Sequence, residues 1–280
     1  MNIFNNLQKM KSKIVFLILL SIFFVSCAEQ PEHIVEQAST NQVKNVDILK
    51  NGDTSRIEEK EIDYGPATGF IALPKKDGIY PAVIMIHEWW GLNDNIKEMA
   101  RSLATEGYVV LAVDLFEGKI AKDANEAREL TTKIRNNNSQ AISNMKSAAQ
   151  FLKNQNNIDK NKIASMGWCF GGQMSLQLAL NEKLAATVIY YGNLETNSTK
   201  LSVIKWPVLG IFGSKDTSIS VDTVKEFEAA LSQLGIENEI YIYPNVGHAF
   251  ANPSGANYAP EETKDAWEKT LKFLEKNLKI

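Results

Sequence analysis

Cys169 lies in a glycine-rich segment whose spacing is typical of a catalytic nucleophile. The segment 167–172 reads Gly-Trp-Cys-Phe-Gly-Gly, so a glycine lies two residues away from Cys169 on either side. The apolar run 163–166 before it predicts a strand, and the pattern of 174–180 after it predicts a helix. A nucleophile in a sharp turn between strand and helix needs these glycines, because a Cβ atom there would collide with neighbouring backbone. A buried structural cysteine beside a tight turn is the alternative interpretation.

Such a turn predicts two partners in a defined chain order, first an acid and then a histidine, each after a later strand. The chain has three histidines, and only His248 lies after Cys169. It follows the expected strand 239–243, and Asp216 follows the preceding expected strand, 208–212. Aspartate is also a common turn residue. Chain order and position after strands nevertheless favour a triad in which His248 is the base and Asp216 orients it.

A second loop could supply hydrogen-bond donors to a developing oxyanion. Residues 87–91 read His-Glu-Trp-Trp-Gly and follow the expected buried strand 82–87. The backbone N–H groups of Trp89 and Phe170 are the candidate donors. His87 precedes the nucleophile and is expected to have an orienting or structural role. A zinc protease motif is rejected, because no second histidine follows four residues after His87.

The elements that must position these residues alternate along the chain. An antiparallel pair, 57–64 and 68–72, is followed by six further expected strands at 82–87, 109–113, 163–166, 185–190, 208–212 and 239–243. Helical patterns lie between them, one capped by Ser220 and ended by Gly235, and the last beginning near Glu261. This alternation predicts the α/β class, with a mostly parallel central sheet and helices on both faces. Without repeats or a change of composition, 57–280 is expected to be one domain.

Composition excludes several classes of function. The chain has 44% hydrophobic and 22% charged residues, which is typical of a folded domain. Lys and Arg total 30 against 33 Asp and Glu, and the dense basic cluster lies at 9–13, so no nucleic-acid partner is expected. Two cysteines, Cys27 and Cys169, are too few for a disulfide framework or a structural zinc site. No metal and no cofactor are expected.

The N-terminus has the pattern of an export signal. Three lysines precede the apolar run 14–25, which is shorter than the about 20 residues of a membrane-spanning helix. Residues 24–27 read Phe-Val-Ser-Cys and resemble the lipobox of bacterial lipoproteins, in which the cysteine is lipidated and becomes the mature N-terminus. An ordinary signal peptide with an incidental cysteine is the alternative. We therefore expect a signal peptide at 1–26, a polar tether at 27–56, and an exported lipoprotein held at a membrane of the bacterial periplasm or outer membrane through lipid on Cys27.

Several segments together resemble the dienelactone hydrolase family of α/β-hydrolases, the carboxymethylenebutenolidase-like enzymes. They are His-Glu-Trp-Trp-Gly-Leu at 87–92, Gly-Tyr-Val-Val-Leu at 107–111 with Asp-Leu-Phe at 114–116, the cysteine turn at 167–172, Gly-Ser-Lys-Asp at 213–216, and Gly-His-Ala-Phe-Ala-Asn-Pro at 247–253. The resemblance implies the α/β-hydrolase fold, with Cys169 as nucleophile, His248 as base and Asp216 as its partner. It also implies that Glu88 is the carboxylate that keeps the resting thiol neutral until substrate displaces it.

The same resemblance narrows the substrate. Dienelactone hydrolases bind the substrate carboxylate with two arginines, one soon after the Asp-Leu-Tyr segment and one shortly after the histidine. Here those regions read Glu-Gly-Lys at 117–119 and Ala-Phe-Ala-Asn at 249–252, which argues against dienelactone itself. The expected reaction is hydrolysis of a small-molecule carboxylic ester or lactone through a thioester on Cys169. The alternatives are a peptidase or other acyl hydrolase, and a non-catalytic or redox-active surface lipoprotein. The oligomeric state is left open.

Overall fold

The computed structural model of the chain describes residues 53–279. The expected signal peptide, the lipobox cysteine Cys27 and the tether up to residue 52 lie outside the described residues. Thr54–Arg56, at the end of the expected tether, form a single 3-10 turn capped by the side chain of Asp53. The backbone N–H of Lys75 donates to the carbonyl of Arg56 at 2.9 Å, which attaches this turn to the end of the second strand.

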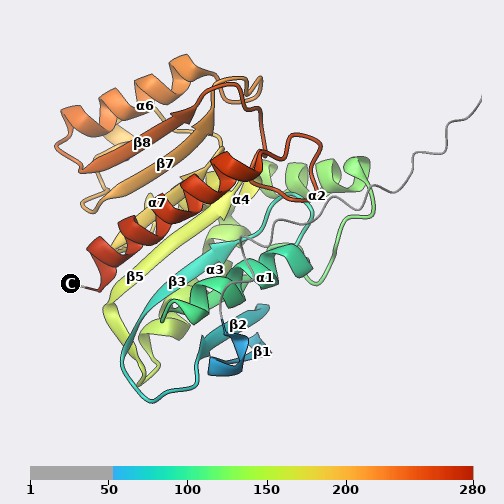
Figure 1. The fold of residues 1–280 in the computed structure, drawn as a ribbon, viewed down its shortest axis with the longest axis vertical. Coiled ribbons are helices and arrows are strands. Elements are labelled where there is room, and N and C mark those ends of the chain that lie inside the picture. Colours follow the sequence, from blue (N-terminus) through green and yellow to red (C-terminus); the bar gives the residue numbers. More distant parts are fainter. Residues whose placement is uncertain (1–52, 280) are drawn as a thin grey trace, which may run out of the picture. The chain divides into compact units, whose positions relative to one another are not determined.

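Eight strands of the described chain form one sheet (Figure 1). They are β1 (Ile57–Asp63), β2 (Thr68–Pro74), β3 (Tyr80–Ile86), β4 (Val109–Val113), β5 (Ile158–Trp168), β6 (Ala186–Tyr190), β7 (Val208–Gly213) and β8 (Asn238–Tyr243). Their spatial order is β1-β2-β4-β3-β5-β6-β7-β8. β1 pairs with β2, and β2 with β4, in antiparallel fashion, and the other neighbours are parallel. The predicted mostly parallel α/β sheet with an antiparallel opening pair is confirmed.

Helices cover both faces of this sheet. They are α1 (Asp94–Thr105), α2 (Ala124–Asn136), α3 (Ser139–Lys153), α4 (Phe170–Ala179), the short α5 (Ser198–Leu201), α6 (Val221–Gln233) and α7 (Pro260–Leu278). The buried side chains of α1 and α7 belong to one apolar cluster, and those of α3, α4 and α6 belong to the other. Figure 1 shows α1 and α7 in front of the sheet.

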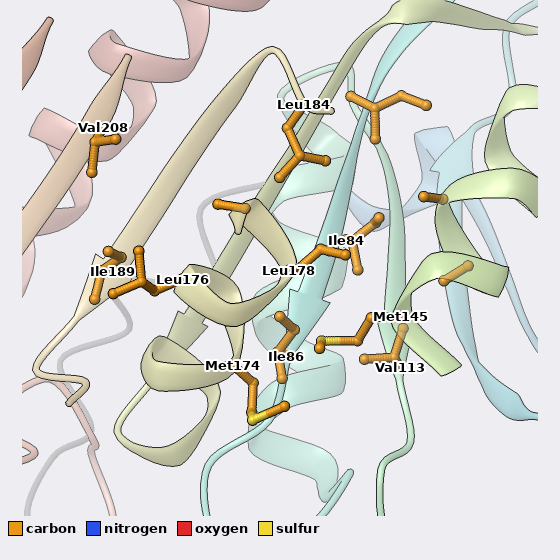
Figure 2. Packing of buried hydrophobic residues seen from close by; sticks show 14 of the residues in the cluster. Ile84, Ile86, Val113, Met145, Met174, Leu176, Leu178, Leu184, Ile189 and Val208 are labelled. Atoms are coloured by element: carbon orange, nitrogen blue, oxygen red, sulfur yellow. The ribbon is translucent and has the colours of Figure 1, made fainter. Parts of the chain in front are cut away.

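The central strands are apolar on both sides because they are buried on both sides. In β3, Ile84 and Ile86 join the cluster of α3 and α4, whereas Val83 and Met85 join the cluster of α1 and α7. Figure 2 shows the side chains of Ile84 and Ile86 packed with those of the helices on their face. The continuous apolar run that predicted a buried strand is therefore explained by two cores that share one sheet.

The ends of several elements agree with the sequence signals, and one differs. Ser220 accepts a hydrogen bond from the N–H of Thr223 at the start of α6, and Gly235 follows the helix with φ of 69°. β5 begins at Ile158, five residues before the expected start, across a register shift in its pairing with β3. The residues between, 159–162, are polar, so the period of buried apolar residues could not identify them as strand.

Candidate active site

The sharp turn after β5 has the strained geometry that its glycines predict. Cys169 adopts φ of 53° and ψ of −116°, a positive φ that residues with a side chain rarely adopt. A Cβ atom on Gly167 would lie 2.3 Å from the carbonyl oxygen of Gly171, and one on Gly171 would lie 2.2 Å from that of Ile86. No side chain fits at either position. The turn therefore projects Cys169 from the carboxyl edge of the sheet, at the N-terminus of α4.

The three residues of the expected triad lie in one hydrogen-bonded chain. His248 Nε2 is 3.1 Å from Cys169 Sγ, and His248 Nδ1 is 2.7 Å from Asp216 Oδ2. The other carboxylate oxygen of Asp216 accepts the backbone N–H groups of Ser218 and Ile219. Cys169, Asp216 and His248 follow β5, β7 and β8, whose carboxyl ends lie at the same edge of the sheet. The sheet thus brings together residues that are 79 and 32 positions apart.

The hydrogen bonds that link Asp216, His248 and Cys169 favour a proton on the imidazole of His248. Burial by itself lowers the pKa of His248, but its hydrogen bonds to Asp216 and Cys169 outweigh burial and raise that pKa to about 10. Burial by itself raises the pKa of Asp216, but the hydrogen bonds from His248 and from the Ile219 and Ser218 N–H groups outweigh burial and hold that pKa below its usual range. An ionised Asp216 therefore stabilises the imidazolium that forms when His248 takes the proton of the thiol.

The loop after β3 lies against the cysteine turn. His87 is buried, accepts the Leu115 N–H at Nε2 (3.1 Å) and lies 2.6 Å through Nδ1 from the carbonyl oxygen of Glu88. Its partners are backbone groups, in line with the expected orienting or structural role. The N–H groups of Trp89 and Phe170 donate to no other group within residues 53–279, so both are free to bind a ligand oxygen.

Glu88 lies in the same cavity as Cys169, but its hydrogen-bond partner is a different residue. Its side chain accepts a short hydrogen bond from Asn252, and the residue is only 4% exposed. Burial raises the pKa of Glu88 to about 7, against the opposing effects of His248 and Asn252. The carboxyl is therefore only half ionised near neutral pH, and in this structure the thiol pairs with His248.

These residues line a cavity of about 490 Å³. Its wall is formed by Glu88, Trp89, Trp90, Arg135, Cys169, Tyr191, Asn193, Ser218, Ile219, His248, Ala249, Asn252, Gly255 and Asn257. A cavity of this size fits a small molecule whose acyl group reaches the sulfur. Tryptophan side chains at one side give it an apolar surface for such a group.

The sequence predicted no role for most residues that line this cavity, among them Tyr191, Asn252 and Arg135. Tyr191 directly follows β6 with φ of 36°, and its buried hydroxyl has no partner among the described residues. A tyrosine at the carboxyl end of a parallel strand was the available signal. Asn252, the partner of Glu88, belongs to the segment 247–253 but was not assigned a role there. Arg135 comes from the exposed side of α2 and brings a guanidinium to the cavity, for which the sequence carries no signal.

Residues 53–279 contain no group of three or more His, Cys, Asp or Glu side chains placed to hold a metal ion. Within the same residues, none of the helices combines the length and the apolarity needed to cross a membrane.

The sheet order, the strained cysteine turn and the placement of three polar residues after β5, β7 and β8 define an α/β-hydrolase. The model of the dienelactone hydrolase family matches residues 67–278, and the chain belongs to that family. It is accordingly an enzyme that hydrolyses esters or lactones.

Individual relatives agree with this assignment. "Protein usf" of Aquifex pyrophilus is 33% identical over 217 residues, which cover 75% of this chain and 93% of that protein. A protein of Saccharolobus solfataricus with the name "Putative carboxymethylenebutenolidase" is 31% identical over 254 residues, covering 77% of this chain and 98% of the relative. The crystal structure named "Putative Dienelactone Hydrolase" from Klebsiella pneumoniae superposes with a TM-score of 0.71 at 28% identity, over 78% of this chain and 98% of the other.

Proposed function

We propose that the protein cleaves a carboxylic ester or lactone through a thioester on Cys169, with His248 as base and Asp216 as its orienting partner. The observation that carries the proposal is the unbroken hydrogen-bonded chain from Asp216 through His248 to the Cys169 sulfur. Membership in a hydrolase family favours a catalytic role over that of a non-catalytic or redox-active lipoprotein. Family membership favours an ester or lactone as the substrate, since the triad would cleave other acyl groups by the same chemistry.

The geometry supports a two-step reaction. The Cys169 thiol gives its proton to His248 Nε2, and the thiolate attacks the acyl carbon, whose carbonyl electron pair moves to oxygen. As the tetrahedral intermediate collapses, the bond to the leaving oxygen breaks and His248 returns the proton to that oxygen. In the second step His248 takes a proton from water, and the hydroxide attacks the thioester carbon to form a second tetrahedral intermediate. Its collapse breaks the carbon–sulfur bond, His248 gives its proton to the leaving sulfur, and the acid leaves with Cys169 restored as the thiol. The Trp89 and Phe170 N–H groups hold the negative oxygen in both steps.

Mass spectrometry of the purified full-length protein tests this proposal. Quenching the reaction with p-nitrophenyl acetate within the first turnovers should give a mass increase of one acetyl group on the peptide that contains Cys169. Hydroxylamine should remove the group, because thioesters react with it readily. An acetyl group found only on lysine or serine residues, with Cys169 unmodified during turnover, would contradict the thioester.

We further propose that Glu88 restrains the resting thiol, and Glu88→Gln tests this. The charged carboxylate disfavours a second negative charge on the nearby sulfur, whereas Gln is neutral at every pH. Since the pKa of Glu88 is about 7, the variant and the wild type should react with iodoacetamide alike below pH 7. Above pH 7 the variant should react faster with iodoacetamide than the wild type, because only the wild type then carries a negative charge close to the sulfur. Its ester turnover should fall, because Gln has no charge whose displacement by substrate could trigger transfer of the thiol proton to His248.

The alkylation rates of Glu88→Gln and of the wild type are compared across the pH range, since the side chain of Glu88 differs from Gln in charge only when it is ionised. A rate ratio that is the same at pH 6 and pH 8, together with unchanged turnover, would mean that Glu88 has no bearing on the nucleophile. The mechanism would then be confined to Cys169, His248 and Asp216.

The location of the protein is also a proposal. We infer a lipoprotein of the bacterial periplasm or outer membrane, in which 1–26 is a signal peptide, 27–56 a tether and 57–280 the hydrolase domain. The basic start, the apolar run 14–25 and the sequence Phe-Val-Ser-Cys at 24–27 support it.

Fractionation of cells tests the lipid anchor. Wild-type protein should be recovered with the membranes, because two or more acyl chains bind a bilayer stably whereas one binds reversibly. Cys27→Ser should leave an unlipidated precursor that retains residues 1–26, visible as a larger mass. Complete recovery of the wild type in the soluble periplasmic fraction would refute the assignment.

A further inference from the structure

We propose that His87 is a positioning residue of the reaction: its imidazole fixes the peptide between Glu88 and Trp89 so that the Trp89 N–H faces the substrate's acyl oxygen. The inference deepens the proposed function and rests on it, since it assigns a residue that holds one of the two oxyanion donors. His87 itself does not touch the reacting atoms.

The hydrogen bonds of His87 define a single tautomer. The Leu115 N–H can only donate, so His87 Nε2, 3.1 Å away, must be the unprotonated nitrogen. The ring proton is then on Nδ1 and is donated to the Glu88 carbonyl oxygen at 2.6 Å. The ring is fully buried, and burial lowers its pKa, which favours the neutral form. His87 is thus a directed donor to one backbone carbonyl.

That carbonyl belongs to the same rigid unit as the candidate donor. The Glu88 C=O and the Trp89 N–H share one planar trans peptide and point in opposite directions. Fixing the oxygen therefore fixes the direction of the N–H. The Gly91 N–H also donates to this oxygen, at 3.3 Å, as part of the turn. The bond from His87 to the Glu88 oxygen is shorter than the bond from Gly91. Because His87 is buried in the core, its bond holds the Glu88–Trp89 peptide against the core, whereas the Gly91 bond lies within the turn.

The surroundings of the ring hold it against both donor segments. The Phe116 ring packs edge-on at 4.6 Å between centroids, and the Phe170 ring lies at 6.0 Å. Phe170 carries the second candidate N–H, directly after the nucleophile. The carbonyl of His87 lies close to Gly171 in the same turn. His87 therefore lies beside both segments whose N–H groups must converge on one oxygen: its ring is bonded to the Glu88 carbonyl, and its backbone carbonyl lies against the cysteine turn.

Two amide substitutions separate the two hydrogen bonds. In His87→Asn the side-chain amide nitrogen lies near the position of Nδ1 and can still donate to Glu88. In His87→Gln the amide oxygen reaches the position of Nε2 and can still accept from Leu115, while the donor to Glu88 is lost. Each variant gives up one buried hydrogen bond, so their unfolding temperatures should be similar. A purely structural histidine would give them similar activities as well.

We expect the activities to differ. Removing one oxyanion donor costs about 10²–10³ in kcat, and a misdirected donor approaches this loss. His87→Gln should therefore lose tenfold or more in kcat relative to His87→Asn, with little change in KM. Iodoacetamide alkylation of Cys169 is a displacement at carbon that forms no oxyanion, so its rate should be the same in both variants. Activity and alkylation are measured on full-length protein in detergent, alongside the unfolding temperature.

Other results would overturn the proposal. Equal kcat in the two variants, or a parallel loss of alkylation and turnover in His87→Gln, would make the histidine a support of the fold. Absence of the acetyl group on wild-type Cys169 would remove the proposed function and this inference with it, whereas its presence with equal variants would remove only the inference. If the variants do not fold, 15N NMR of the wild-type histidines decides: a proton on Nε2 of His87 would refute the proposal and one on Nδ1 supports it.

Discussion

Cys169→Ala is expected to reduce kcat for an activated short-chain ester by about 10⁴–10⁶, to the level left by binding and oxyanion stabilisation alone. The sulfur is the nucleophile, and the structure offers no replacement for it at the end of the chain from Asp216 through His248. His248→Ala should have an effect of similar size. Asp216→Asn should lower kcat by about 10⁴, because the amide favours the wrong tautomer of the imidazole.

Double variants test whether the three residues act as one unit. Because each single change already disables proton transfer to and from the sulfur, Cys169→Ala with His248→Ala should be little worse than the worse single variant. Asp222→Asn, an exposed carboxylate in the first turn of α6, is the matched control and should keep wild-type turnover. Initial rates with p-nitrophenyl acetate are the measurement. Turnover near that of the wild type in Cys169→Ala would remove the mechanism.

Gly171→Ala should destabilise the folded protein by about 3 kcal/mol or more, at the upper end of the range for overpacked sites. A Cβ atom there would lie 2.2 Å from the carbonyl oxygen of Ile86 and 2.5 Å from that of His87. Both are backbone atoms at the end of β3, and Ile86 pairs with Gly167 across the sheet, so neither can move away without disturbing the pairing. This outcome is opposite to helix propensity, since Ala is preferred over Gly within a helix such as α4.

Gly235→Ala is the control that replaces a glycine by alanine without a steric clash. Gly235 has φ of 69° and no atom within 4 Å of its would-be Cβ, so only the left-handed backbone opposes alanine, at about 1–2 kcal/mol. Urea unfolding of each variant, followed by circular dichroism, gives the free energies of unfolding. A Gly171→Ala protein as stable as Gly235→Ala, or more stable, would show that the turn relaxes and that close approach to β3 is not required.

The sequence by itself determined the class of the fold and the order of the chemistry. Buried parallel strands appear as continuous apolar runs, and the cysteine turn needs glycines for a local steric reason. Both features can therefore be recognised from a few neighbouring residues of the sequence. The scarcity of histidine identifies the base of the triad, because His248 is the one histidine of the sequence that follows Cys169. The strand and turn signals depend on short-range constraints, and for that reason the sequence predicts the fold class and indicates Cys169, Asp216 and His248 as one triad.

Only the tertiary structure decided what surrounds the nucleophile. The approach of Asn252 to Glu88 joins groups 164 positions apart, and the burial that raises the pKa of Glu88 depends on every segment packed around it. Arg135 of α2 and Tyr191, which directly follows β6, line the same cavity although they are far apart in the sequence. The tautomer of His87 depends likewise on the Leu115 N–H of a neighbouring segment. Contacts of this kind follow from packing between distant segments, and packing has no period or spacing that can be read along the chain.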